Sequence, residues 1–192
     1  MIRILIAGCL LLMLSTTVEA QIAWGVKGGL NVSTLGANSS VYTPRLGYHA
    51  GIYYKQRLEP QYGLQFELQY SLQGARDATI NNRRLSYNYL HLPLLMKFYF
   101  RQNGYFSIGP QVSYLLKANA VEEGYKDNIT DGLRKWDISV LVGLGKEVDW
   151  GNFGARFGWG ALNTSGASVA SAVVFRNLLL QFYVGFKLQD LN

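Results

Sequence analysis

Few residues of this chain are suited to acid–base or nucleophilic chemistry, and its two histidines, His49 and His91, come first among them. A hydrolase needs a nucleophile within hydrogen-bond reach of a base that a third group orients, and a serine, a histidine and Glu67 could be combined in that way. Nothing in their spacing requires the combination. Two histidines without clustered carboxylates also make a poor metal site. We therefore predict no catalytic residue, no metal and no cofactor, with both histidines hydrogen-bonded to neighbouring side chains.

The elements that position these residues are strands, because apolar and polar side chains alternate along much of the chain. In residues 63–73, Leu64 and Phe66 share one face while Glu67 and Gln69 share the other, which is the period of two that a β-strand produces. The same alternation recurs in eight segments. They are residues 22–33, 46–57, 63–73, 85–100, 105–118, 136–148, 153–162 and 176–188.

The connections between these segments are alternately long and short. Three are tight turns: Glu59-Pro60-Gln61, Gln102-Asn103-Gly104 and Asp149-Trp150-Gly151-Asn152. Asn-Gly readily adopts the positive φ angles of a tight hairpin. The other four are residues 34–45, 74–84, 119–135 and 163–175. Short and long connections therefore lie at opposite ends, as in a membrane barrel with periplasmic turns and extracellular loops.

Two prolines, Pro93 and Pro110, interrupt the expected ladder because proline has no backbone N–H to donate. An unpaired carbonyl is costly in hydrocarbon, so we predict a bulge or a local bend at each proline.

Alternation alone does not decide which face meets lipid, since a soluble lipocalin-like barrel would place its apolar face inside. Aromatic residues on the apolar face favour the transmembrane arrangement, because they gather near both strand ends as interfacial girdles do. Toward the short turns these are Trp24, Tyr54, Phe106, Phe153 and Phe186, and toward the loops they are Tyr70, Tyr114, Trp136 and Trp159.

Composition and the N-terminal segment agree with export to a membrane. Charged residues make up only 16% of the chain, aromatic residues 14%, and there are 21 glycines. Residues 1–20 are predicted to be a cleaved secretory signal peptide, with Arg3, an apolar core and a small-residue site ending at Ala20. Lipid attachment at Cys9 is disfavoured because the apolar core continues after it. Residues 21–192 are then expected to form one outer-membrane β-barrel domain. Export and the scattered placement of the basic residues argue against a nucleic-acid role despite the net charge of +6.

Charged side chains fall into two predicted groups. The first is a polar network that fills the barrel interior: Lys55, Glu67, Lys97, Lys117, Asp137, Glu147 and Arg156. The second stands where strands meet the long loops and would contact lipopolysaccharide phosphates through charge-assisted hydrogen bonds. Its members are Arg45, Arg76, Arg83, Arg84, Arg134, Lys135 and Arg176. The alternative is that these are isolated cations, partly balanced by acidic loop residues.

Four stretches give the chain a family resemblance: WGVKGGLNVS, YLHLPLLMKFYF, IGPQVSYLL and FYVGFKL, at residues 24–33, 89–100, 108–116 and 182–188. The chain resembles the outer-membrane beta-barrel domain proteins known as PorT-like or porin-family proteins. The resemblance implies an eight-stranded barrel in the Gram-negative outer membrane. It also implies that prolines are tolerated at the positions of Pro93 and Pro110, and it implies no catalytic residue.

The sequence thus predicts an all-β protein, an eight-stranded antiparallel up-and-down transmembrane β-barrel with a non-enzymatic structural, binding or accessory role. The expected partners are outer-membrane lipids, including lipopolysaccharide, and a protein of the envelope. The resemblance allows a link to protein secretion. Two alternatives remain: a lipid-modifying barrel enzyme that depends on His49 or His91, and a soluble periplasmic barrel that binds an apolar ligand.

Overall fold

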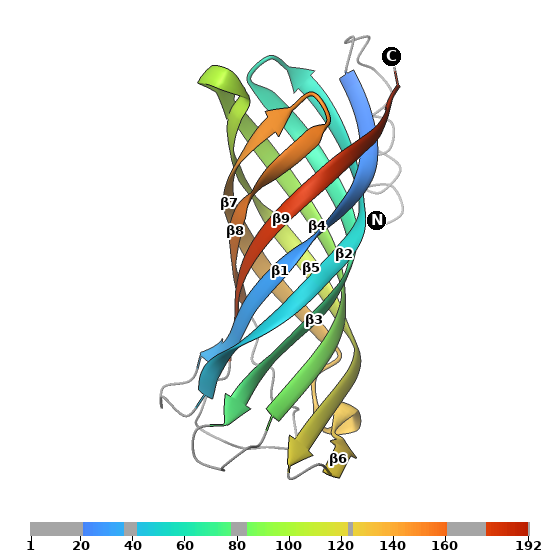
Figure 1. Cartoon of the computed structure of the whole chain (residues 1–192), viewed down its shortest axis with the longest axis vertical. Helices are drawn as coiled ribbons and strands as arrows, with labels where there is room; N and C mark the ends of the chain where they lie inside the picture. Colours follow the sequence, from blue (N-terminus) through green and yellow to red (C-terminus); the bar gives the residue numbers. More distant parts are fainter. Residues whose placement is uncertain (1–20, 37–41, 78–83, 123–124, 161–175, 192) are drawn as a thin grey trace, which may run out of the picture.

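Antiparallel pairing joins the strands of this chain into a ring, as the computed structural model shows (Figure 1). The structure describes residues 21–36, 42–77, 84–122, 125–160 and 176–191. The strands are β1 (Gln21–Gly36), β2 (Tyr42–Glu59), β3 (Tyr62–Asp77), β4 (Arg84–Phe100), β5 (Gly104–Glu122), β6 (Tyr125–Asn128), β7 (Trp136–Val148), β8 (Gly151–Gly160) and β9 (Arg176–Leu191). Chain neighbours pair with one another, β1 pairs with β9, and the pairing of β5 with β7 bypasses β6.

The eight predicted strands are confirmed as β1 to β5 and β7 to β9, which close the ring. Residues 161 and 162, the last two of the predicted seventh strand, lie outside the described residues. A closed ring pairs the backbone of every strand with two neighbours, which is what a sheet needs in order to cross hydrocarbon. The barrel has a turn end, where β1 begins and β9 ends, and a loop end, where β1 ends and β2 begins (Figure 1).

Burial alternates along the strands with the polar face inside. On β4, His91 and Lys97 are 2% and 1% exposed, whereas Leu92 and Met96 between them are 52% and 40% exposed. An apolar outer surface of this extent is unfavourable in water and favourable against acyl chains. The soluble lipocalin-like alternative is therefore wrong, since that barrel would bury its apolar face.

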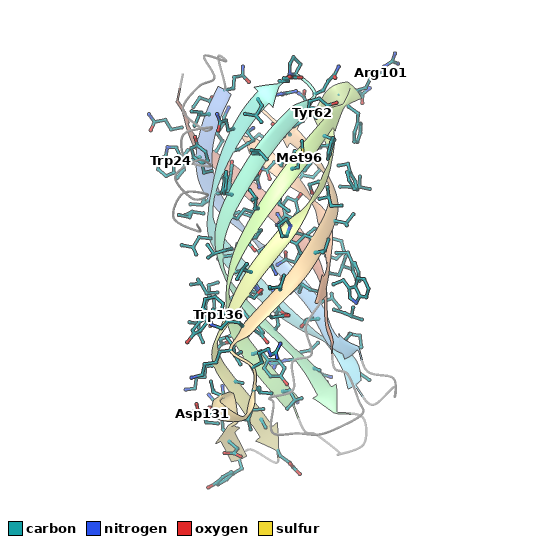
Figure 2. The ribbon with its side chains drawn as sticks, turned by 180° about the vertical axis from the view of Figure 1, so that it is seen from behind. Trp24, Tyr62, Met96, Arg101, Asp131 and Trp136 are labelled. Atoms are coloured by element: carbon teal, nitrogen blue, oxygen red, sulfur yellow. The ribbon has the colours of Figure 1, made fainter. Side chains whose placement is uncertain are left out.

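Exposed aromatic side chains mark both ends of this outer surface. Figure 2 shows Trp24 near the turn end and Trp136 near the loop end, both on the outside of the barrel. These two indoles are 38% and 57% exposed. Tyr70 and Trp159, near the loop end, and Phe153, near the turn end, are exposed as well. The two predicted girdles accordingly have outward-facing members at both ends.

The turn between β4 and β5 has the expected tight geometry but a different register. A 3-10 turn, η1 (Arg101–Asn103), connects the strands, and its positive φ angles fall on Gln102 at 61° and Asn103 at 59°. Gly104 has a φ of −68°, so the prediction that the Asn-Gly pair supplies these angles is wrong at the glycine.

None of the helices in the described part of the chain is long and apolar enough to cross a membrane.

Of the bulge or local bend predicted at Pro93 and Pro110, the bulge is wrong. The register of β4 with β3 and with β5 is the same on both sides of Pro93, and that of β5 with β7 runs unbroken through Pro110. The β4–β5 ladder lacks residue pairs between Pro93↔Gln111 and Met96↔Ile108. The missing backbone N–H of each proline is thus accommodated without an extra residue in either strand. The β4–β5 bulge lies instead between Asn88 and Tyr89, nearer the loop end.

One element was not predicted. β6 pairs with the end of β5, so this hairpin extends past the ring at the loop end (Figure 1). A second 3-10 turn, η2 (Thr130–Gly132), follows it, and Thr130 Oγ1 accepts a 2.9 Å hydrogen bond from the backbone N–H of Ala118. Ile129 and Leu133 pack against a buried cluster at the base of the hairpin. These contacts join the base of the hairpin to the barrel wall.

Candidate functional site: the polar interior and the loop-end rim

The interior of the barrel is centred on Glu67 of β3, whose carboxylate projects inward and whose side chain is fully buried. Arg156 of β8 donates to both of its oxygens, from Nη1 to Oε2 at 2.9 Å and from Nη2 to Oε1 at 2.8 Å. Lys27 of β1 donates from Nζ to Oε1 at 2.7 Å, and the side-chain amides of Gln65 and Gln69 also donate to the carboxylate. One carboxylate thus connects three strands by charge-assisted hydrogen bonds.

A second ion-pair cluster lies toward the turn end, around Glu147 of β7. Its Oε2 accepts a 2.7 Å hydrogen bond from Lys55 of β2, and its Oε1 accepts one of 3.1 Å from Lys97 of β4. Tyr99 donates its hydroxyl to Oε1 at 2.9 Å. Glu67 and Glu147 therefore each face two cations.

Two tyrosines join the clusters. The hydroxyl oxygens of Tyr105 and Tyr183 are 2.8 Å apart. Lys97 Nζ lies 3.9 Å from the centre of the Tyr105 ring, and Lys27 Nζ lies 3.8 Å from that of Tyr183. Cations over aromatic faces gain electrostatic stabilisation that grows as water is excluded.

Glycines leave the space that these tyrosines occupy. A Cβ added at Gly145 would lie 2.6 Å from Tyr105 Oη, and one added at Gly154 would lie 2.7 Å from Tyr183 Oη. The glycines of β7 and β8 thus admit bulky rings into a narrow interior, a role that the alternation pattern did not reveal.

Nearer the loop end the interior is filled by amides, hydroxyls and both imidazoles. His49 Nδ1 lies 2.7 Å from Asn31 Oδ1, and His91 Nδ1 lies 2.7 Å from Ser113 Oγ. The other ring nitrogen of His91 is 2.7 Å from the side-chain nitrogen of Gln73. The contacts of Glu67 are with cations and amides, so it does not orient either histidine as a hydrolase triad would require.

A cavity of about 330 Å³ opens at the turn end of this interior and is lined by Lys55, Arg57, Glu147 and Asp190 among others. A smaller cavity of about 10 Å³ touches His91 and Asp137, which is room for one water molecule. Among the described residues there is no group of three or more potential metal-binding side chains.

The structure brings together most of the residues that were predicted for the interior. Lys55, Glu67, Lys97, Glu147 and Arg156 belong to the two ion-pair clusters, and Asp137 is buried beside the small cavity. Lys117 does not join them: its side chain is exposed on the outer face. The bulge between Asn88 and Tyr89 shifts the alternation of β5 by one residue, which is why Lys117 was misplaced.

Lys27 is an interior cation that the prediction missed. It is 3% exposed and contacts Glu67 directly. The signal was present in the sequence, because Lys27 lies on the opposite face of β1 from Trp24 and Val26. Only the tertiary structure shows which carboxylate it meets.

The described members of the predicted loop-end group of cations have different surroundings. Arg76 and Arg84 are paired directly across β3 and β4 and are both exposed. Arg45 Nη1 instead donates to the carbonyl of Leu85 at 2.7 Å. The guanidinium group lies beside Gly74, and a Cβ added at this glycine would be 2.9 Å from Arg45 Nη1.

The remaining predicted rim residues lie elsewhere on the chain. Arg134 and Lys135 precede β7 and are exposed, and Lys135 Nζ lies 3.9 Å from Asp131 Oδ1. Arg83 and the side chain of Arg176 lie outside the described residues.

Comparison with known proteins agrees with this architecture. Residues 16–165 match the model of a family described as outer membrane protein beta-barrel domain. The fold is similar to that of Neisserial surface protein A, with a TM-score of 0.59, 14% identity, and coverage of 86% of this chain and 97% of that one. The outer membrane protein OprG from Pseudomonas aeruginosa gives a TM-score of 0.45 at 12% identity, covering 90% of this chain and 97% of that one. No curated protein sequence matches the chain.

Proposed function

Because this chain belongs to the outer membrane protein beta-barrel domain family and is an integral outer-membrane barrel, we propose that it acts as a sealed, non-enzymatic barrel. In this proposal its loop end binds a partner in the cell envelope. The observation that carries the proposal is the bridge of Arg156, Glu67 and Lys27 across the interior. An eight-stranded barrel is only wide enough for side chains, so a bridge of this kind leaves no room for solute flow.

Burial also argues against catalysis in the interior. His91 and Ser113 are in hydrogen-bond contact, as a catalytic base and nucleophile would be, yet each residue is only 2% exposed. A lipid ester would have to enter the packed interior to reach them. Since structural contacts occupy the middle of the interior, we assign function to the outer wall and the loop end.

The β5–β6 hairpin is the best-defined candidate for partner binding at the loop end. Tyr125 is 83% exposed on β6, and the hairpin is held by the packing of Ile129 and Leu133 at its base. A rigid support lowers the entropy lost on binding, and an exposed tyrosine is a frequent interface residue. A part in protein secretion is the more specific form of this proposal, and it rests on the PorT-like resemblance.

Planar-bilayer recording tests whether the barrel is sealed. Purified wild-type protein should give no reproducible unitary conductance, whereas the Lys97→Ala/Arg156→Ala variant, which loses two interior cations, should give openings if it remains folded. Heat-dependent gel mobility checks folding of both proteins. A reproducible unitary step from the wild type would refute the sealed interior.

Site-directed photocross-linking in intact outer membranes tests partner binding. A photoreactive residue at position 125 should give a discrete cross-linked protein, while the same residue at position 62, near the turn end, should not give that product. Equal cross-linking of one protein from both positions would contradict a loop-end site.

A further inference from the structure

We propose that Lys117 and Arg134 bind a phosphate group of lipopolysaccharide on the outer wall of the barrel, on the loop-end side of the aromatic pair of Tyr114 and Trp136. The site lies outside the barrel, so it does not depend on whether the interior is sealed.

A β-bulge creates the first half of this site. Tyr89 of β4 is paired with Leu115 of β5, but the preceding Asn88 is paired with Lys117, so Leu116 is an extra residue. Regular alternation would have sent Lys117 inside together with Leu115, which is 1% exposed. Bulges redirect side chains in this manner. Here the effect is to place a lysine on the lipid-facing side of the wall.

The height of Lys117 matches the headgroup region. Tyr114 and Trp136 form an edge-to-face pair with ring centres 4.8 Å apart, and Trp136 is 57% exposed. Aromatic girdles lie at the level where acyl chains give way to headgroups. At about 3.3 Å per residue, Lys117 lies roughly 7–10 Å beyond Tyr114 along β5. A cation just past the girdle is within reach of headgroup phosphates.

Arg134 supplies the second half. The carbonyl of Lys135 accepts a 2.7 Å hydrogen bond from the N–H of Leu115, which holds this segment against β5 at the bulge. Arg134 is the next residue toward the loop end, and its side chain is exposed. Figure 2 shows Trp136 on the outer side of the wall, with Asp131 farther toward the loop end.

The charges around this pair suit an anion. Lys117 and Arg134 are both exposed, and the nearby carboxylate of Asp131 forms an ion pair with Lys135. Asp131 itself is almost fully exposed, at 97% of its side chain. A phosphate between an ammonium and a guanidinium group would form charge-assisted hydrogen bonds with both.

Other loop-end cations fit a headgroup less well. Arg45 is tied to the carbonyl of Leu85. On β3 and β4 the aromatic girdle lies at the level of the paired residues Tyr70 and Leu90. Arg76 and Arg84 are paired several residues beyond that level, toward the loop end.

Titration of the folded protein in detergent micelles with diphosphorylated lipid A tests the site. Binding is read from adducts in native mass spectrometry and from tryptophan emission. Lys117→Gln and Arg134→Gln should each weaken binding about tenfold, the loss expected for one charge-assisted hydrogen bond. Lys146→Gln is the matched control, because Lys146 is exposed on β7 next to the turn end. It should bind as the wild type does, and dephosphorylated lipid A should bind weakly to every variant.

Three results would overturn the proposal. Unchanged binding by folded Lys117→Gln and Arg134→Gln variants would remove these residues from the site. An equal loss in Lys146→Gln would show a general effect of charge. Displacement of the lipid by millimolar inorganic phosphate would identify free phosphate as the ligand instead. None of these results bears on conductance, so failure here is distinguishable from failure of the sealed-barrel proposal.

Discussion

Replacing Glu67 with glutamine tests how far the interior ion pairs stabilise the barrel. The carboxylate accepts two hydrogen bonds from Arg156 and one from Lys27, and the side chains of Glu67, Lys27 and Arg156 are at most 2% exposed. A glutamine of nearly the same shape leaves both cations without a counter-charge. It also turns an amide donor toward groups that are themselves donors.

The expected loss is large because the cations have no route to water. Removing one partner of a buried ion pair costs about 3–5 kcal/mol, since the remaining charge stays desolvated. Glu147→Gln should cost less, about 1–3 kcal/mol, because Glu147 borders the cavity at the turn end and keeps some contact with water. Glu59→Gln, at an exposed position, should change stability by less than about 0.5 kcal/mol.

Urea unfolding in lipid vesicles, followed by tryptophan fluorescence, provides the free energies by linear extrapolation. The double variant Glu67→Gln/Arg156→Met completes a mutant cycle with the two single variants, and a coupling of at least about 1 kcal/mol is expected for groups in direct contact. A loss below about 1 kcal/mol for Glu67→Gln, or a coupling near zero, would show that the ion pair does not stabilise the barrel.

Three further substitutions test the packing and the chemistry of the interior. Gly145→Ala should destabilise the barrel by about 1–3 kcal/mol in the same urea assay, because its Cβ would lie 2.6 Å from the hydroxyl of Tyr105, whereas Gly132→Ala, with open space around it, serves as the control. Tyr183→Phe should cost about 0.5–1.5 kcal/mol through loss of the 2.8 Å contact with Tyr105, and no change would mean that this contact is neutral. His91→Gln should leave fatty-acid release from phospholipid or lipid A at the wild-type background, and activity that disappears with this substitution would favour the enzyme alternative.

The positions of strands follow directly from the sequence, because a period of two is a local property. Once Leu64 and Phe66 alternate with Gln65 and Glu67, the strand has one apolar face and one polar face in any fold. The short and long connections then limit the topology to hairpins in chain order. The direction of the apolar face was inferred from the placement of aromatic residues, and that inference holds in the structure.

Registry between strands and contacts across the interior are decided only in three dimensions. A single inserted residue at Leu116 turns Lys117 outward, and no local pattern distinguishes that from regular alternation. The choice of Glu67 as the partner of Arg156, 89 residues away, depends on strand tilt and on which side chains meet across the closed barrel. The sequence alone determines the pattern of each ribbon, since that pattern arises from neighbouring residues. The closing of the ring determines which charges meet, because it brings together residues that the chain keeps far apart.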